Sequence, residues 1–306
     1  MKKFILHIIL FFAVAVAVDR AFGLVLDHMN AHLKGGENQL HYDTFCHAEA
    51  DVLIFGSSRA NHHYVPSVVA DSLHLSCRNC GYDALGVLNM YGRYRMMASR
   101  RKPKVVIYDV FPDNDIYGSS ADHLRFLDGL KCHVGKPVID SILFNVAPME
   151  RWKLLSHIYR YNTTVFRLVN DYFFSAPIGE QGYLPLYGTM DYQPKNYAPR
   201  FVGQEPDIVK LAYLEKLVHA AQADGAFVAL VASPYYGATS DADFQVARQL
   251  CHRLDVPFLN HCTDTAFTRR REWYKDSSHL NHEGARRFTS VIMEEVKRLQ
   301  TIPSGL

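Results

Sequence analysis

The chain has 306 residues, 48% of them hydrophobic, which is enough for one large folded domain or two small ones with packed cores. Its 33 basic and 31 acidic residues leave a formal charge of only +2. A balance of this kind excludes the strong positive field that nucleic-acid binding requires, so we expect no nucleic-acid partner.

The N-terminus is typical of an exported or membrane-attached protein. Lys2 and Lys3 precede an apolar run over 4–18 that only His7 interrupts. About 15 residues span roughly 22 Å as a helix, which is shorter than the ~30 Å hydrocarbon core and within the size of a signal-peptide apolar region. Length alone therefore favours a cleaved signal.

The sequence after this run favours retention. Apolar character resumes beyond Arg20 and continues to Leu26, so a longer helix could span the membrane while Arg20 reaches the interface. Cleavage near Ala15-Val-Ala17 is the alternative, and it would give a secreted or periplasmic protein. We favour an uncleaved anchor over 1–26, with the domain facing the periplasm, and a connector over 27–49.

Beyond this segment, apolar runs alternate with amphipathic helical patterns. Strands are predicted near 52–55, 75–79, 104–109, 226–232 and 256–259. Helices are predicted at about 83–99, 207–223, 240–254 and 282–299. Because strands that alternate with helices form parallel sheets, we expect a three-layer α/β/α domain over 50–299 and a tail over 300–306.

Between about 119 and 201 the alternation gives way to aromatic-rich, irregular and partly helical sequence, which predicts an insertion. Its aromatic side chains could form a lid that stacks on a glycan. Alternatively, they fill the small core of a helical cap. We favour the cap.

A candidate nucleophile and its candidate base lie near opposite ends of the domain. The first strand runs into Gly56-Ser57-Ser58, so Ser58 is expected at the carboxyl edge of the sheet, where α/β proteins present functional side chains. Asp276 precedes His279 by three residues, just before the last helix. A serine hydroxyl becomes a good nucleophile when an imidazole takes its proton and a carboxylate orients that imidazole.

In these two segments the chain resembles the SGNH or GDSL-type hydrolases, and its overall look is closest to membrane-anchored members from Bacteroidetes-type bacteria. The Gly-Ser-Ser tripeptide matches the family's first block, where the second position is usually Asp, and Asp-x-x-His matches the last block. The resemblance covers about 50–299 and implies a flavodoxin-like fold. It implies Ser58 as the nucleophile, His279 as the base and Asp276 as the third member of the triad.

The resemblance also implies donors for the oxyanion of a tetrahedral intermediate besides the N–H of the nucleophile. Gly81 follows the second strand and fits the family's second block. The third block is normally Gly-x-Asn-Asp, and the chain has Pro112-Asp113-Asn114-Asp115 there, with proline in place of the glycine. Asn114 is the donor that this block implies.

Several neighbouring residues have competing interpretations. His282 is a rival base, but the three-residue spacing favours His279. His62 and His63 are expected at the surface or lining a pocket just beyond the nucleophile. Arg59 could neutralise an acidic substrate or pair with a nearby carboxylate.

The six cysteines are compatible with export. Cys77 and Cys80 are expected to be buried thiols, or one structural disulfide forms that involves Cys46. Zinc would require a second pair of ligands at matching spacing, which the sequence does not show, so we expect no metal and no organic cofactor.

The interpretation is a serine esterase of the cell envelope that hydrolyses an oxygen ester, with a small acyl group such as acetyl on a carbohydrate. One alternative is an O-acyltransferase acting on an envelope glycan. Another is a membrane-tethered glycan-binding or assembly protein without catalysis. The expected partners are a glycan or small-molecule ester and the membrane, and the sequence leaves the acyl group and the oligomeric state open.

Overall fold

The computed structural model describes residues 1–194 and 197–301, so the predicted tail lies outside the described residues from 302 onward. The chain divides into two compact units. The first comprises Met1–Asp43 and Leu127–Ile178, and the second comprises Thr44–Phe126 and Gly179–Leu306. The segment predicted as one insertion, 119–201, is therefore shared between the two units.

The second unit contains a five-stranded parallel sheet with the strand order β2-β1-β3-β4-β5. Its strands are β1 (Val52–Gly56), β2 (Cys77–Asn79), β3 (Val105–Asp109), β4 (Phe227–Ala232) and β5 (Phe258–Asn260). The predicted α/β fold is confirmed, and each predicted strand lies within three residues of an observed one. Because the order reverses at β1, the carboxyl ends of β1 and β3 form the switch point at which open α/β sheets have a crevice.

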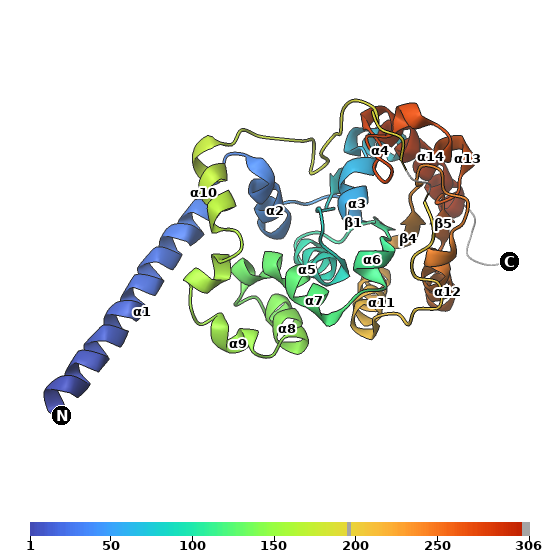
Figure 1. Cartoon of the computed structure of the whole chain (residues 1–306). Helices are drawn as coiled ribbons and strands as arrows, with labels where there is room; N and C mark the ends of the chain where they lie inside the picture. Colours follow the sequence, from blue (N-terminus) through green and yellow to red (C-terminus); the bar gives the residue numbers. More distant parts are fainter. Residues whose placement is uncertain (195–196, 302–306) are drawn as a thin grey trace. The chain divides into compact units, whose positions relative to one another are not determined.

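Helices cover both faces of this sheet, as Figure 1 shows. They are α3 (Ser58–His63), α4 (Pro66–Leu73), α5 (Val87–Ala98), α11 (Ile208–Ala223), α12 (Gln245–Leu254) and α14 (His282–Thr301). Ile54 packs in one cluster with Phe288 of α14. Phe55 points to the opposite face, because side chains alternate along a strand, and its ring centroid lies 6.1 Å from that of Tyr94 on α5.

Helices cover both faces of the sheet, and this explains why β1 and β3 are continuous apolar runs in the sequence. Every residue of these two strands is buried, as expected for parallel strands that have helices on both faces. Shorter elements of this unit lie in the connections: α6 (Pro112–Asp115), α7 (Ser120–Leu127), η3 (Ala242–Phe244), α13 (Thr265–Thr268) and η4 (Arg271–Trp273).

The first unit is helical. Its elements are α1 (Lys2–Ala31), most of α2 (Gly36–Cys46), η1 (Asp128–His133), α8 (Pro137–Val146), α9 (Glu150–Lys153), η2 (Ile158–Tyr161) and α10 (Val165–Phe174). A small core joins Leu26 and Met29 of α1 to Tyr161 and Leu168. These contacts explain why the helix continues to Ala31, beyond the predicted 1–26 segment.

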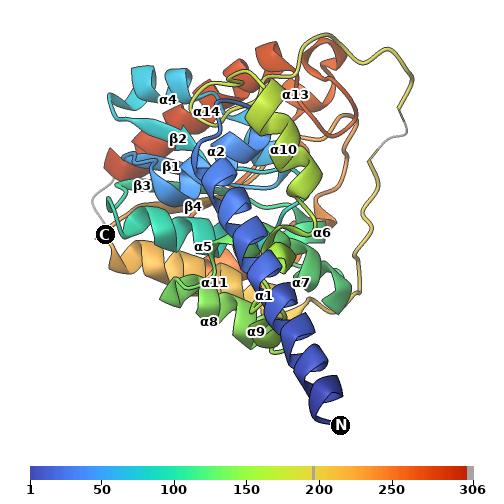
Figure 2. The ribbon, with the colours of Figure 1, turned by 90° about the vertical axis from the view of Figure 1, so that its left-hand side faces the viewer.

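The N-terminal part of α1 extends past the other helices of its unit (Figure 2). Residues 2–18 are exposed along their whole length although nearly all of them are apolar. Among the described residues, α1 alone has the length and composition of a membrane-crossing helix. A long, apolar and exposed N-terminal helix is the form expected of a signal sequence or a membrane anchor.

Candidate active site

The three residues predicted as a triad lie in contact in the second unit. Ser58 Oγ is 2.8 Å from His279 Nε2. On the other side of the ring, His279 Nδ1 is 3.0 and 2.9 Å from the two carboxylate oxygens of Asp276. A carboxylate can only accept, so Nδ1 carries the proton and Nε2 is the acceptor for the serine hydroxyl. This is the arrangement of nucleophile, base and orienting group that activates a serine.

A sharp turn after β1 brings Ser58 to the edge of the sheet. Gly56 has φ +141°, and a Cβ atom at this position would lie 2.5 Å from the carbonyl oxygen of Asp109 on β3. Glycine fits here because it has no Cβ atom to clash with Asp109 and can adopt this positive φ without strain. The chain then leaves the sheet, and Ser58 is the first residue of α3.

The loop that carries the base is organised by the carboxylate of Asp276. Its Oδ1 accepts the backbone N–H groups of Ser278 and His279, each at 2.9 Å. Partial burial by itself would raise the pKa of Asp276, but these hydrogen bonds and the adjacent His279 lower it well below its ordinary value. Asp276 therefore stabilises the fold at neutral pH, and this contribution is lost only in strong acid as the pH falls through the depressed pKa.

His63 of α3 holds the same loop from the interior. Its Nε2 accepts the N–H of Leu280 at 3.0 Å, and its carbonyl accepts the hydroxyl of Thr289 at 3.1 Å. Complete burial lowers the pKa of His63 well below the ordinary value, so the ring stays neutral and Nε2 stays an acceptor. The expectation of a surface or pocket-lining residue is wrong for His63, because α14 packs over α3.

His62, which was expected at the surface or lining a pocket, is buried and lies beside His279. Its ring centroid is 5.7 Å from that of His279. Nδ1 contacts the carbonyl of Leu184 at 2.6 Å, and Nε2 contacts a carboxylate oxygen of Asp83 at 3.3 Å. Both partners are acceptors, so only the imidazolium satisfies both. Burial opposes that charge, but the bonds to Asp83 and Leu184 raise the pKa of His62 overall.

The two expected oxyanion donors already have hydrogen-bond partners. The N–H of Gly81 donates to Asn79 Oδ1 at 3.0 Å. Asn114 Nδ2 donates to Ser57 Oγ at 2.8 Å and to the carbonyl of Leu85 at 3.1 Å. Either group can therefore donate a hydrogen bond to an oxyanion only if it first breaks one of these hydrogen bonds.

Gly81 also has a packing role that any larger residue would disturb. A Cβ atom there would lie 2.5 Å from the backbone nitrogen of Asn61 and 2.9 Å from the side chain of Ala60. Both of these residues belong to α3, so the glycine allows the segment after β2 to approach the helix that begins with Ser58.

Two other candidates lie away from the nucleophile. His282 Nδ1 contacts the hydroxyl of Tyr183 at 2.9 Å, which identifies His279 as the histidine that faces Ser58. Arg59 is buried, and its guanidinium carbon lies 3.9 Å from the ring centroid of Tyr235.

A cleft of about 530 Å³ opens beside Ser58 and His279. Polar and charged groups dominate its walls, which also include Ser57, Asp83, Ala84, Phe111, Asp113, Asn114, Asp122 and Arg125. Asp113 is paired with Arg200 at 2.5 Å, and Asp122 is paired with Arg125 at 3.2 Å. The cleft therefore offers many hydrogen-bonding groups together with apolar surface.

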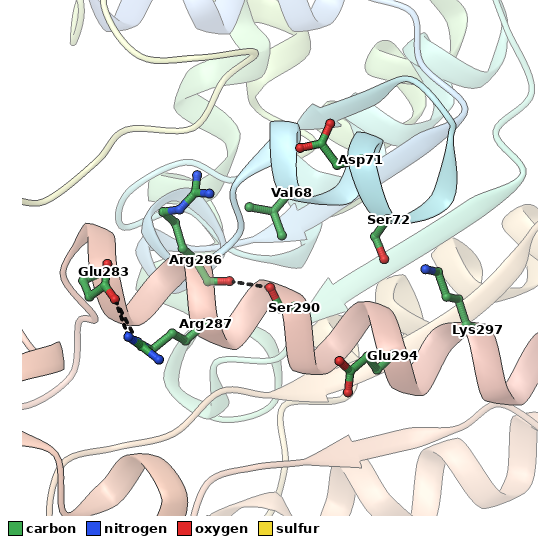
Figure 3. A pocket seen from close by; sticks show the side chains of 9 residues that line it. All are labelled: Val68, Asp71, Ser72, Glu283, Arg286, Arg287, Ser290, Glu294 and Lys297. Atoms are coloured by element: carbon green, nitrogen blue, oxygen red, sulfur yellow. Dashed lines mark hydrogen bonds and ion pairs between the residues drawn. The ribbon is translucent and has the colours of Figure 1, made fainter.

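A second hollow, of about 500 Å³, lies between α4 and α14 (Figure 3). Glu283 and Arg287 form an ion pair at 2.7 Å along α14, and the hydroxyl of Ser290 donates to the carbonyl of Arg286 at 3.1 Å. The residues that line this hollow include no histidine, so it lacks the imidazole that Ser58 contacts in the first cleft.

The cysteines do not form the structural disulfide that was one of the two expectations. The described part of the chain contains all six, and no two of them are joined. Burial raises the pKa of the Cys77 thiol well above its ordinary value and that of Cys80 to about 11, so both are poor nucleophiles. In the first unit, His41, Cys132 and His133 bring one potential ligand atom each within 4.8 Å of one another. A closed structural zinc site takes four protein donors, one more than this group has.

No protein-family model and no curated protein matches the chain. Solved structures that it matches include a GDSL-like lipase from Bacteroides thetaiotaomicron, at 12% identity and a TM-score of 0.39, over 88% of this chain and 94% of that one. An acetyl-xylooligosaccharide esterase from Geobacillus matches at 12% identity and a TM-score of 0.41, over 82% and 94%. A two-domain esterase active on acetylated mannans matches at 11% identity and a TM-score of 0.40, over 88% and 55%.

The matched structures also include an acylhydrolase from Bacteroides fragilis, at 14% identity and a TM-score of 0.40, over 89% of this chain and 94% of that one. Sequence identity is low throughout, so what those proteins bind or hydrolyse remains a property of those proteins.

Proposed function

We propose that the chain is a serine esterase of the SGNH type that hydrolyses an oxygen ester. The observation that carries this proposal is the 2.8 Å contact between Ser58 Oγ and His279 Nε2, in a ring that Asp276 holds through its other nitrogen. The three residues come from segments that are 221 positions apart in the chain. Such a contact in a polar cleft at a sheet switch point favours catalysis over a purely structural role for the serine.

In the first half of the reaction, Ser58 Oγ attacks the carbonyl carbon of the ester while His279 Nε2 takes the hydroxyl proton. The negative charge develops on the former carbonyl oxygen. We assign the backbone N–H of Ser58 to this charge, since Ser58 is the first residue of α3 and the first N–H groups of a helix have no acceptor within the helix. The Asn114 amide can donate a second hydrogen bond to the oxyanion if it turns away from Ser57. The Gly81 N–H can donate a third if it gives up its bond to Asn79.

The second half releases both products and restores the site. His279 donates its proton to the alkoxide oxygen of the leaving group as the carbon–oxygen bond breaks, and the acyl group stays on Ser58. A water molecule then attacks this acyl group and gives its proton to His279. Collapse of the second intermediate releases the acid, and the proton returns from His279 to Ser58 Oγ.

The walls of the cleft support a small acyl group on a hydroxyl-rich leaving group. Phe111 and Ala84 are the apolar members of the lining, whereas carboxylates, an amide and a guanidinium make up most of the rest. A long fatty acyl chain requires an extended apolar groove, but sugar hydroxyls pair well with such polar groups. We therefore propose an acetylated carbohydrate as the substrate class. A sugar hydroxyl that replaces water in the second half would make the same site an O-acyltransferase.

We predict that a fluorophosphonate probe labels the chain at a single serine, Ser58. The probe reacts with serines whose hydroxyl is activated by a base, and among the described serines Ser58 contacts an imidazole Nε2 that a carboxylate orients. Peptide mass spectrometry of the labelled chain locates the adduct, and His279→Ala should suppress the labelling. Labelling at another serine, or no labelling of the folded chain, would contradict the proposed nucleophile.

We also propose that α1 is retained as a membrane anchor with the rest of the chain on the periplasmic side. The expected result is that the intact chain, beginning at its N-terminal residues, stays in the membrane fraction after alkaline carbonate washing. This follows from the exposed apolar stretch 2–18, which water solvates poorly. Intact-mass spectrometry of the purified protein checks it, and a chain that begins near Val18 would show cleavage instead.

A further inference from the structure

The charged pair Asp19 and Arg20, which follows the continuously exposed stretch 2–18 of α1, is bound by a turn of its own unit. The carboxylate of Asp19 accepts the hydroxyl of Ser156 at 2.5 Å and the backbone N–H groups of His157 and Ile158 at 2.9 and 3.2 Å. Arg20 donates to the carbonyl of Leu155 at 2.6 Å. The turn 155–158 therefore marks the level at which α1 begins to pack against the other helices of its unit.

A group of exposed apolar side chains lies on this turn and on α9 just before it. Trp152 is 66% exposed, Met149 64%, Leu155 58% and Ile158 38%. Single exposed apolar residues are ordinary in soluble proteins, but four of them within ten positions form a patch of the kind that marks an interaction site. The group is continuous with α1, because its own turn binds Asp19.

The charges of the segment 149–158 suit an anionic surface. Arg151 and Lys153 are exposed, and the one acidic residue, Glu150, is buried and paired with Lys153 at 3.0 Å. Its exposed charge is therefore positive. Basic side chains next to a membrane attract anionic phospholipid headgroups.

The length of the exposed helix places this segment at a bilayer surface. From Lys2 to Asp19 the helix rises about 26 Å, close to the ~30 Å hydrocarbon core. With Lys2 at the cytoplasmic face, Asp19 and the turn that binds it reach the opposite interface. Tryptophan is enriched at that depth, because its ring is apolar and its N–H is polar.

We propose that the segment 149–158, here called the membrane foot, inserts Trp152, Leu155 and their apolar neighbours into the outer interfacial layer of the bilayer that α1 crosses. This inference rests on the proposed membrane anchor and goes beyond it. The first unit is then held against the lipid surface by two contacts, the transmembrane helix and the membrane foot. Its orientation relative to the bilayer is therefore restricted.

The chain has only two tryptophans, Trp152 in the foot and Trp273 in the second unit, which allows a direct test. The full-length protein is reconstituted into vesicles of zwitterionic and anionic phospholipids whose acyl chains carry bromine at a chosen depth. We expect lipids brominated near the headgroup to quench part of the tryptophan emission. The quenched part should be absent in Trp152→Phe, an exposed substitution that leaves the fold intact. The converse variant, Trp273→Phe, should keep it.

Flotation of the vesicles in a density gradient separates the two proposals. Protein that floats with the vesicles, but whose quenching is the same in Trp152→Phe and in the wild type, would overturn the foot and leave the anchor standing. Protein that does not float would overturn the anchor and the foot together. Quenching only by bromines at the ends of the acyl chains would also contradict the interfacial depth proposed here.

Discussion

Replacing Ser58 or His279 by alanine is expected to abolish ester hydrolysis while leaving the chain folded. Loss of either side chain removes the 2.8 Å contact through which the hydroxyl is activated. In serine hydrolases, removing the nucleophile or the base lowers kcat by at least about 10³-fold, and the losses of the two are not additive. We therefore expect Ser58→Ala, His279→Ala and the double variant to be equally inactive.

The measurement is p-nitrophenyl acetate hydrolysis by the full-length protein in detergent. Asp276→Asn should retain the loop but lose about 10²- to 10⁴-fold in kcat, since an amide does not hold the ring in the same tautomer. Matched controls are Ser290→Ala on α14 and His219→Ala on α11, both exposed and both expected to hydrolyse the ester at the wild-type rate. Each removes the same chemical group away from the cleft.

Two results would change the proposed mechanism. Full turnover by His279→Ala would show that the base lies elsewhere. A folded wild-type chain that neither hydrolyses p-nitrophenyl acetate nor takes up an acyl group would favour an acyltransferase that requires its own donor. If Ser58→Ala also leaves every cellular function of the chain intact, the glycan-binding protein without catalysis is the better description.

Asp109→Ala is expected to lower the free energy of unfolding by about 2–6 kcal/mol, because each of two buried hydroxyls left without its acceptor costs about 1–3 kcal/mol. Asp109 ends β3 and is completely buried. It accepts the hydroxyl of Tyr64 at 2.6 Å and that of Ser233. Burial raises the pKa of Asp109, and the cation of Arg59 opposes this rise. Alanine would leave two buried hydroxyls without their acceptor and the Arg59 charge without its counter-charge.

Chemical denaturation followed by circular dichroism measures this effect. Asp71→Ala is the matched control, because Asp71 is exposed on α4 and its loss should change the stability by no more than about 0.5 kcal/mol. An Asp109→Ala protein with the wild-type unfolding transition would show that the hydroxyls and Arg59 find other partners. Hydrolysis should fall in the same variant, since β3 borders β1, which ends just before Ser58.

The sequence by itself determined the elements of the sheet and predicted the contact among Ser58, His279 and Asp276. Strands β1, β3 and β4 lie within one residue of their predicted ranges, because burial on both faces makes each of them a short continuous apolar run. The contact among these three residues could be predicted because the features that signal it are local in the chain. Gly56 is required by the turn that follows β1. The three-residue spacing of Asp276 and His279 is required because the Asp276 carboxylate accepts the backbone N–H of His279 in its own loop.

Only the tertiary structure decided which groups surround the triad. His62 and His63 read as polar residues next to a nucleophile, yet both are buried because α3 packs beneath α14 and the loop before it. The N–H of Gly81 is engaged by Asn79, and the segment 119–201 is shared between two units. Local patterns depend on neighbours along the chain, whereas burial and hydrogen-bond partners depend on which distant segments pack together. The strand order and the helices on each face determine which distant segments pack together. A single segment of the sequence does not carry this information.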